Sequence, residues 1–262
     1  MLESVDAVRF DRRMNSGRTS PCLIVGHRED GQEVELIAKF SECCDRKVDG
    51  LVSEALAAIL AADLDLFVPE PFLLHFDAGF VDLLPASVRP LSDKMRASVS
   101  VAFGSTKLPA GFALLPRDKA ITKSLQQQAA EIFAFDGLII NPDRRPENPN
   151  CLLDGNSFAI FDHELAFMTQ GILGWRPPWE RGGLDAMRQH LFFMLLAGQP
   201  CDLRRFKGAW ATVSDNRLAE YHDALPPQWH AGSKNIDSTL EYIARVRDNI
   251  ESAIAEIERV LA

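Results

Sequence analysis

The sequence lacks the cysteine pattern and the long hydrophobic runs that mark several classes of protein. Its five cysteines are odd in number and form no CxxC pair. A disulfide framework or a structural zinc site is therefore not expected, and a reducing compartment is favoured. No apolar run approaches the roughly 18 uninterrupted residues of a membrane-spanning helix, and the N-terminal segment has no apolar stretch typical of a signal peptide. These absences predict a soluble, cytoplasmic protein with no membrane partner.

Positive charge is also scarce. Lys and Arg number 28 against 37 Asp and Glu, which gives a formal net charge of −9. Because binding to nucleic acid needs a basic surface, nucleic acid is not expected as the main partner. The motifs GxxxxGK(S/T) and GxGxxG are absent, which excludes Walker-type and Rossmann nucleotide sites as far as motifs allow.

What is present is enough apolar sequence for a full core, arranged at first as short strands. Apolar residues make up 47% of the chain. Runs at 22–25 and 34–40 flank a polar turn and predict a β-hairpin. Apolar residues at helical spacing predict a helix over roughly 50–62. The other expected elements of this half are strands at 72–76 and 97–103 and a loop at 85–95.

From about residue 120 the pattern becomes helical. Apolar residues at helical spacing from Leu125 onward predict a long helix that ends at Asn141-Pro142. The elements expected after it are strands at 151–153 and 158–161, a loop at 171–183, and helices up to the end of the sequence.

These two patterns predict an α+β fold with two unlike lobes. We expect a strand-rich N-terminal lobe with one helix over residues 1–105, and a helical C-terminal lobe over residues 106–262. Two lobes joined by one connection favour a ligand cleft between them. The connection is expected near Gly104–Leu108. The adenine base is expected near residues 103–106, where a turn at Gly104-Ser105 would offer unpaired backbone groups and glycine would allow close approach.

The segment with the most specific chemistry runs from Asn141 to Asn150. Asp143 and Asn148 have the D-x-x-x-x-N spacing of a phosphotransferase catalytic loop, in which the aspartate accepts the proton of the attacking hydroxyl and the asparagine holds a metal ion. Asp162 follows an apolar strand, where a second, metal-binding aspartate is expected. Such carboxylate and amide oxygens suit Mg²⁺. The same Pro- and Asn-rich composition is also typical of an ordinary surface loop.

Further short segments accompany that loop. They are GRTSP at 17–21, IAKF at 37–40, SE at 53–54, VPEP at 68–71, FDGLIINPDR at 135–144, NPN at 148–150 and FDH at 161–163. Together, over about residues 15–167, they resemble the HipA-like kinases, a bacterial family whose catalytic domain is distantly similar to eukaryotic protein kinases and phosphatidylinositol kinases.

The resemblance implies a protein-kinase-like fold and ATP-dependent phosphorylation, usually of Ser or Thr. It implies that Asp143 is the catalytic base and that Asn148 and Asp162 bind Mg²⁺. His163 and Glu164 stand where protein kinases have Phe-Gly after this aspartate, so conformational switching at that point does not carry over from protein kinases.

The resemblance also implies a site for the phosphates of ATP. Lys39 would bind the α- and β-phosphates and be held by Glu54 from the following helix. The apolar stripe of that helix, however, places Glu54 on the opposite face. A further segment could supply backbone N–H groups and a cation to the phosphates: Gly17, Arg18, Thr19 and Ser20. The same four residues are equally typical of a turn ahead of Pro21.

Three functions stay open at this level. The chain could be an active protein kinase, a kinase-fold enzyme acting on a small molecule or a lipid headgroup, or a nucleotide-binding scaffold without turnover. The joint presence of Asp143, Asn148 and Asp162 argues against the scaffold. The expected cofactors are ATP and Mg²⁺, and the expected partner is an unidentified phosphate acceptor; the sequence does not predict the oligomeric state.

Overall fold

The structure, a computed structural model, describes residues 2–14, 17–115, 122–169 and 174–262. The chain divides into two compact units, each built from segments far apart in the sequence. The first unit contains Met1–Ile59, Pro69–Leu108 and Glu220–Ile236, and the second contains Leu60–Val68, Pro109–Ala219 and Asp237–Ala262. The predicted division after residue 105 lies close to Leu108. Two segments do not follow it, because Leu60–Val68 belongs to the second unit and Glu220–Ile236 to the first.

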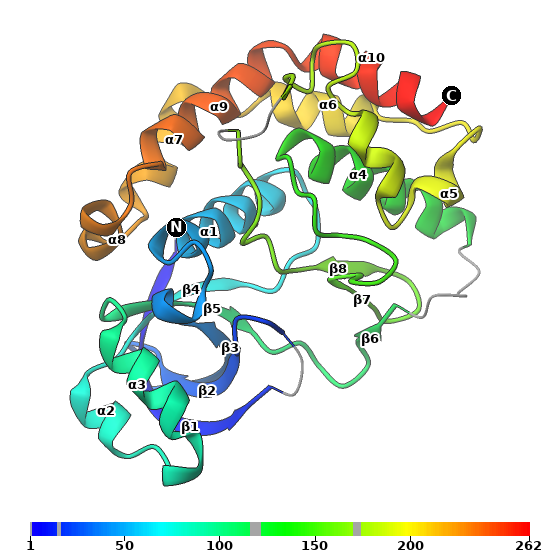
Figure 1. Ribbon diagram of the computed structural model, residues 1–262. Helices are drawn as coiled ribbons and strands as arrows, with labels where there is room; N and C mark the ends of the chain where they lie inside the picture. The colour runs from blue at the N-terminus through cyan, green and yellow to red at the C-terminus, as the bar shows by residue number, and fades with distance from the viewer. Residues whose placement is uncertain (1, 15–16, 116–121, 170–173) are drawn as a thin grey trace. The chain divides into compact units, whose positions relative to one another are not determined.

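A five-stranded sheet closes on itself in the first unit (Figure 1). The strand order is β1-β2-β3-β5-β4, and β4 pairs with β1 to complete the ring. The β1–β4 pair is parallel and the other pairs are antiparallel. The elements are β1 (Glu3–Arg13), β2 (Cys22–His27), β3 (Glu33–Lys39), η1 (Ser41–Cys43), α1 (Val48–Asp63), β4 (Pro71–His75), α2 (Ala78–Asp82), η2 (Ala86–Val88), α3 (Arg89–Ala97), β5 (Val101–Thr106) and α8 (Pro227–Gly232).

Helices α2 and α3 pack on this closed sheet. Phe80 of α2 and Leu91 and Met95 of α3 belong to the same buried cluster as the inward-facing strand residues. Leu91 and Met95 are four residues apart and so share one helix face. The prediction of a loop at 85–95 is therefore wrong: Pro90 stands in the first turn of α3, where proline is tolerated, and burial of that face against the sheet stabilises a helix.

Gly104 and Ser105 lie inside strand β5. Gly104 pairs with Ala38 of β3 and with Phe72 of β4. A Cβ atom at Gly104 would come within 3.1 Å of Leu36 Cδ1, so the glycine serves packing within the sheet. The turn predicted at this point is wrong because pairing continues to Thr106 with β3 and to Ser105 with β4. The backbone of Gly104 and Ser105 is paired within the sheet, so it does not offer the unpaired groups on which the predicted adenine contact depended.

A late segment of the chain returns to the first unit. Trp229 of α8 is fully buried, and its Nε1 donates to the carbonyl oxygen of Val101 at 2.9 Å. Asn235 Nδ2 donates to the Asp49 carboxylate at 2.7 Å. A Cβ atom at Gly232 would lie 2.9 Å from a methyl carbon of Val48. These contacts with α1 and β5 make Glu220–Ile236 part of this unit.

The second unit is built of helices around a small sheet. Strands β6, β7 and β8 are antiparallel and adjacent in that order, and α4 contacts β8, α5 and α10. The predicted long helix and both predicted strands of this half are confirmed. The elements are β6 (Ala113–Leu114), α4 (Lys123–Leu138), β7 (Cys151–Leu153), β8 (Phe158–Ile160), η3 (Asp185–Gln189), α5 (Phe193–Leu196), α6 (Arg204–Ala211), α7 (Asp215–Asp223), α9 (Ile236–Asp248) and α10 (Ile250–Leu261). The part of α7 from Glu220 onward and Ile236 of α9 belong to the first unit.

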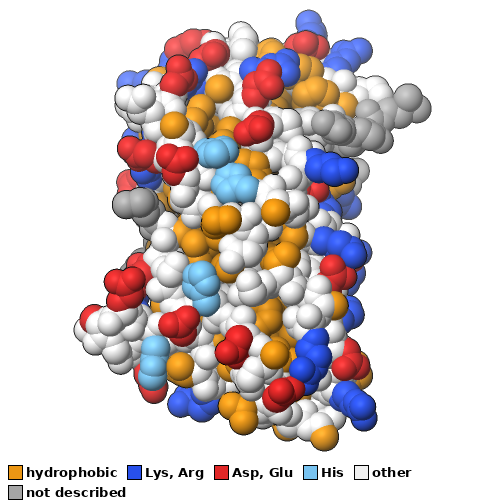
Figure 2. All heavy atoms as spheres, turned by 90° about the vertical axis from the view of Figure 1, so that its left-hand side faces the viewer, with side chains coloured by type: hydrophobic (Ala, Val, Ile, Leu, Met, Phe, Trp, Pro, Cys, Tyr) orange, Lys and Arg blue, Asp and Glu red, His pale blue; other side chains and the backbone are white. Residues whose placement is uncertain are grey.

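Charges of both signs lie on the surface. Figure 2 shows acidic, basic and hydrophobic side chains interspersed along the face that it presents. Among the helices of the described ranges, none combines the length and the apolar character needed to cross a membrane.

Candidate active site

Helix α4 ends in a turn that starts the candidate catalytic loop. The N–H of Ile140 donates to the carbonyl of Gly137 at 3.3 Å, and the N–H of Asn141 to that of Asp136 at 2.8 Å, which is the paired bonding of a Schellman motif. The left-handed position of that motif usually holds glycine, but here it holds Ile140 with a φ of 53°. This conformation costs a β-branched residue about 1–2 kcal/mol, and it persists only where surrounding contacts fix it.

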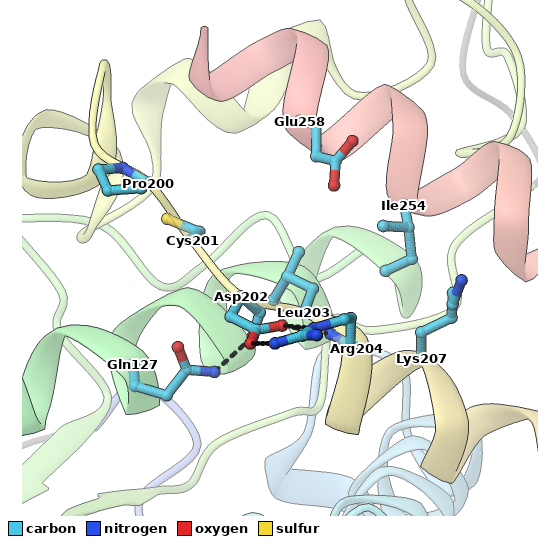
Figure 3. A pocket seen from close by; sticks show the side chains of 9 residues that line it. All are labelled: Gln127, Pro200, Cys201, Asp202, Leu203, Arg204, Lys207, Ile254 and Glu258. Carbon is cyan, nitrogen blue, oxygen red and sulfur yellow. Dashed lines mark hydrogen bonds and ion pairs between the residues drawn. The ribbon is translucent and has the colours of Figure 1, made fainter.

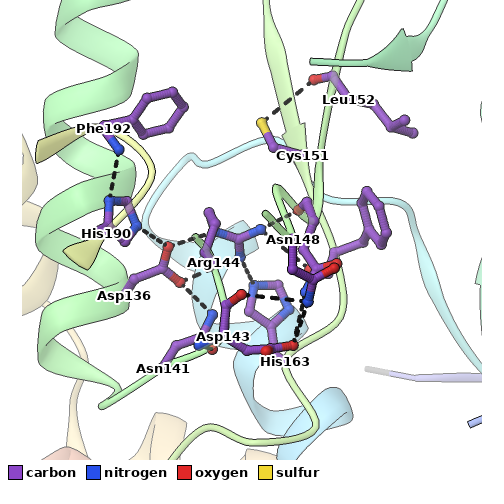
Figure 4. A network of polar contacts seen from close by, with 12 residues as sticks. Asp136, Asn141, Asp143, Arg144, Asn148, Cys151, Leu152, His163, His190 and Phe192 are labelled. Carbon is purple, nitrogen blue, oxygen red and sulfur yellow. Dashed lines mark hydrogen bonds and ion pairs between the residues drawn. The ribbon is translucent and has the colours of Figure 1, made fainter. Parts of the chain in front are cut away.

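Those contacts centre on a guanidinium with no solvent exposure (Figure 4). The side chains of Arg144 and Asp136 are both 0% exposed. Arg144 Nε donates to Asp136 Oδ2 at 2.5 Å, and Nη2 donates to Oδ1 at 3.3 Å. The remaining N–H groups of Arg144 donate to His163 Nε2 at 3.0 Å and to the carbonyls of Asn150 and Phe161. The buried cation thus ties the loop to α4 and to the segment after β8.

This network fixes the protonation of its histidines. Arginine only donates hydrogen bonds, so His163 Nε2 accepts and carries no proton. His190 Nδ1 accepts from the N–H of Phe192 at 3.1 Å, and its Nε2 donates to Asp136 at 2.9 Å. Burial lowers the pKa of His190, which keeps it neutral. Burial by itself raises the pKa of Asp136, but the charge of Arg144 and the bond from His190 outweigh it and hold that pKa well below its usual range.

Asp143 lies on the anchored loop with its carboxylate oriented by amides (Figure 4). Asn148 Nδ2 and Asn150 Nδ2 donate to Asp143 Oδ2 at 2.8 and 3.1 Å. The N–H of Asp143 donates to Asn141 Oδ1 at 3.2 Å. Among the described residues, no donor contacts Asp143 Oδ1, which leaves that oxygen to accept a proton. Because the amide nitrogen of Asn148 is engaged, its Oδ1 is the atom available to a ligand.

Asp162 is held beside this loop. It follows β8 in a left-handed backbone conformation with a φ of 62°. The N–H of the preceding Phe161 donates to the carbonyl of Asn150 at 3.2 Å. Arg144 donates to the carbonyls of Asn150 and Phe161. The candidate metal-binding aspartate therefore shares a bonded framework with the candidate catalytic loop.

The oxygens at the loop fit a magnesium ion that arrives with phosphate. Within the ranges that the structure describes, no group of three or more His, Cys, Asp and Glu side chains could hold a metal ion. Asn148 Oδ1 and the carboxylate of Asp162 are hard oxygen ligands. Mg²⁺ is usually bound through one or two protein carboxylates together with substrate phosphates and water, so this donor set suits Mg²⁺-ATP.

A second candidate cluster lies in the first unit. Lys39 ends β3 and Glu54 lies on α1, and their side chains form an ion pair that is 9% and 3% exposed. The prediction that Glu54 lies on the far side of its helix is wrong. Helix α1 is buried on every side from Gly50 to Ala61, so its apolar stripe does not define an exposed opposite face.

Replacement of Lys39 by methionine is expected to lower the free energy of unfolding by about 3 kcal/mol, because it leaves the Glu54 carboxylate buried without its cation. Lys107→Met is the matched control. Lys107 pairs with Glu35 in an ion pair that is 42% and 48% exposed, so its loss should cost less than about 1 kcal/mol. Urea unfolding of the three proteins measures both effects. Equal losses in the two variants would contradict a special role for the buried pair.

The turn between β1 and β2 contains the candidate phosphate-binding segment. Gly17 has a φ of 104°, and the N–H of Ser20 donates to its carbonyl at 3.3 Å. Arg18 is exposed and forms an ion pair with Asp45, whereas Thr19 is buried. These residues form the turn ahead of Pro21, and their contact with phosphate stays a prediction.

The sequence analysis missed two residues of the buried network, Asp136 and His190. Asp136 is the only charged residue in the apolar stretch 132–140. Because a lone carboxylate is almost never fully buried unless it is paired, its position inside a predicted buried helix indicates a hidden cation. That cation is Arg144, which belongs to the motif but has no assigned role in it.

One hollow in the second unit contains none of these residues (Figure 3). Its volume is about 470 Å³, and its lining comes from α4, α6, α10 and the stretch before α6. Arg204 in this lining pairs with Asp202 at 2.6 Å, and Lys207 pairs with Glu251 at 2.9 Å. Burial raises the pKa of the Cys201 thiol, which disfavours a reactive thiolate. We assign no function to this hollow.

Comparison with known proteins gives a family and a fold. A family model described as HipA-like kinase matches residues 7–257. The structure is similar to that of the proinflammatory kinase CtkA of Helicobacter pylori, with 12% sequence identity, a TM-score of 0.53, and coverage of 100% of this chain and 99% of that chain. The MAP kinase LmaMPK10 of Leishmania major matches with 13% identity over 97% of this chain and 84% of that chain, but its TM-score of 0.29 is too low to support a shared fold. No match is found among curated proteins.

The strand-rich N-terminal part, the helices that follow and the similarity to CtkA along the whole chain define a kinase-like fold. The chain belongs to the HipA-like kinase family, whose model covers it almost from end to end. The resemblance recognised from its motifs is thereby confirmed.

Proposed function

We propose that this chain is a Ser/Thr protein kinase that uses Mg²⁺-ATP. The observation that supports the proposal best is the orientation of Asp143, whose Oδ2 is bonded to two amides while Oδ1 has no donor among the described residues. In this orientation Asp143 accepts the proton of the attacking hydroxyl. The buried Arg144 holds the loop that carries it, so the carboxylate is positioned before the acceptor arrives.

The remaining residues of the proposal act on the nucleotide. Asn148 and Asp162 would hold Mg²⁺ through their oxygens, and the ion would supply positive charge to the phosphates of ATP. Lys39 binds the α- and β-phosphates, and its ion pair with Glu54 keeps the ammonium group in one position. The turn at Gly17–Ser20 offers the backbone N–H groups of its exposed residues, Gly17 and Arg18, to the same phosphates.

ATP with Mg²⁺ is expected to raise the melting temperature by mass action. At a concentration 100 times the dissociation constant the stabilisation is about 2.7 kcal/mol, which corresponds to roughly 5–10 °C for a chain of this length. The shift should fall sharply in EDTA, because Asn148 and Asp162 reach the phosphates through the metal. A melting curve without any Mg²⁺-dependent change at millimolar ATP would contradict the proposed nucleotide site.

Phosphoryl transfer itself is tested with ATP labelled in the γ-phosphate. The protein is incubated with Mg²⁺ and labelled ATP, alone and with cell lysate, and protein-bound label is measured. Label on serine or threonine that disappears in the Asp143→Ala variant supports the proposed activity. Nucleotide binding without transfer to any protein would indicate a scaffold or a different acceptor.

A further inference from the structure

Two hollows flank the loop that carries Asp143. One has a volume of about 200 Å³ and a mainly apolar lining that includes Pro142 and Trp175. The other has a volume of about 610 Å³, and Met194 contributes to its lining. Arg145, two residues after Asp143, lines both hollows. A chain that presents a hydroxyl to Asp143 therefore meets these surfaces with its flanking residues.

Three exposed arginines line these hollows without a carboxylate partner among the described residues. Arg145 donates to the carbonyl of Pro142 at 2.7 Å, Arg176 donates to a backbone carbonyl at 3.0 Å, and Arg188 lies over the ring of Phe193 at 5.5 Å. Asp185 acts electrostatically on Arg176 and Arg188, but its carboxylate is bonded to Arg259. In a chain where acidic residues outnumber basic ones by 37 to 28, three such cations around one loop favour an anionic ligand.

An exposed apolar side chain completes this surface. Met194 is 84% exposed, more than any other large hydrophobic side chain in the described ranges. It lines the larger hollow together with two arginines, Arg145 and Arg188, and one carboxylate, that of Glu147. A surface that combines cations with a flexible, exposed methionine suits a polypeptide that carries both acidic and apolar residues.

We propose that these hollows bind the phosphate acceptor, and that the acceptor is an acidic polypeptide segment; this rests on the kinase function proposed above. Glutamate or aspartate residues near the acceptor Ser or Thr bind Arg145 and Arg188, and an apolar neighbour contacts Met194. The hydroxyl oxygen then forms a bond to the γ-phosphorus, the bond from that phosphorus to ADP breaks, and the hydroxyl proton passes to Asp143.

A degenerate peptide library tests the proposal with the full chain. Each peptide has one central Ser or Thr, and Glu, Gln or Lys is fixed in turn at each flanking position. Transfer from Mg²⁺-ATP is expected to favour Glu over Lys by about 10-fold at one or more positions. Arg188→Glu should lower kcat/KM for the preferred acidic peptide by about 3- to 10-fold and reduce its advantage over the lysine peptide, as expected for exposed ion pairs.

Arg89→Glu is the matched control, because Arg89 is exposed on α3 in the first unit and makes the same charge change there. It should leave the preference unchanged. Equal use of glutamate and lysine peptides, or an acidic preference that survives Arg188→Glu, would overturn the proposal. So would transfer to phosphatidylinositol vesicles but to no peptide.

The Mg²⁺-dependent melting shift separates these outcomes from failure of the kinase function. A shift that persists while peptides are refused overturns only the acceptor assignment. Absence of both the shift and any transfer overturns the nucleotide site, and the acceptor assignment with it.

Discussion

Asp143→Ala is expected to lower the rate of phosphoryl transfer by about 10²–10⁴-fold, the usual contribution of a positioned general base, and to leave ATP affinity nearly unchanged. Asp143 binds Asn148 and Asn150 through one oxygen and offers the other to the acceptor, so its loss removes proton acceptance and not a metal ligand. Single-turnover transfer and a separate ATP titration measure the two quantities.

Asp162→Ala is expected to give the opposite result, with loss of most Mg²⁺-dependent ATP binding. In the proposed site its carboxylate holds the metal that joins the nucleotide to the protein. Asp93→Ala is the control for both variants, because Asp93 is exposed on α3; it should alter neither binding nor transfer. An equal loss of ATP affinity in the Asp143 and Asp162 variants would show that their roles are assigned wrongly.

Arg144→Met is expected to lower the free energy of unfolding by about 3–5 kcal/mol at pH 7, because it leaves the Asp136 carboxylate buried without its cation. The same change at Arg204 is the control. Arg204 pairs with Asp202 in an ion pair whose arginine is 87% exposed, so Arg204→Met should leave the free energy of unfolding nearly unchanged. Urea unfolding measures both, and similar losses in the two variants would contradict the anchoring role of Arg144.

The effect of Arg144→Met should depend on pH in a defined direction. The pKa of Asp136 is depressed in the native protein, so its contribution to stability is present above its unfolded pKa, near 3.9, and is lost as the pH falls through the folded value. Without Arg144 that carboxyl is expected to have a raised pKa, so the variant loses stability as the pH rises. The difference between the two proteins should therefore shrink as the pH falls from 7 toward 4.

A double variant separates this charge effect from a change in packing. Asp136→Asn combined with Arg144→Met removes both charges and should remove most of the pH dependence of the difference. Its loss of stability should be smaller than the sum of the two single losses, by about 0.5–3 kcal/mol. Additive losses would mean that Asp136 and Arg144 do not stabilise each other.

Much of the second unit was predictable from local pattern. The helical spacing from Leu125 to Asn141 and the two short strands after the loop are local signals, and the structure confirms them as α4, β7 and β8. The D-x-x-x-x-N spacing and the later Asp162 predicted a catalytic loop, and the short segments around them identified the family, without any knowledge of contacts. Short-range features carry such information because a helix face and a tight turn are set by residues only a few positions apart.

The first unit was less predictable because partner strands define it. Strand β1 has one buried residue, Val5, among eleven, and register shifts interrupt its apolar alternation, so its pairing with β2 and β4 defines it. Helix α3, with Pro90 in its first turn, forms where the sequence predicts a loop, and Gly104 lies in a strand where the sequence predicts a turn. In each case the element forms because of what it packs against, and hydrophobic burial depends on neighbours that the local sequence does not contain.

What the sequence alone determined is the family, the loop and the residue types suited to phosphoryl transfer. Only the tertiary structure decided that Lys39 pairs with Glu54, that Arg144 lies unexposed between Asp136 and His163, and which oxygen of Asp143 has no donor among the described residues. The physical reason is that a charge is stable inside a protein only when specific partners meet it there. Those partners lie on separate elements, so only folding brings them together.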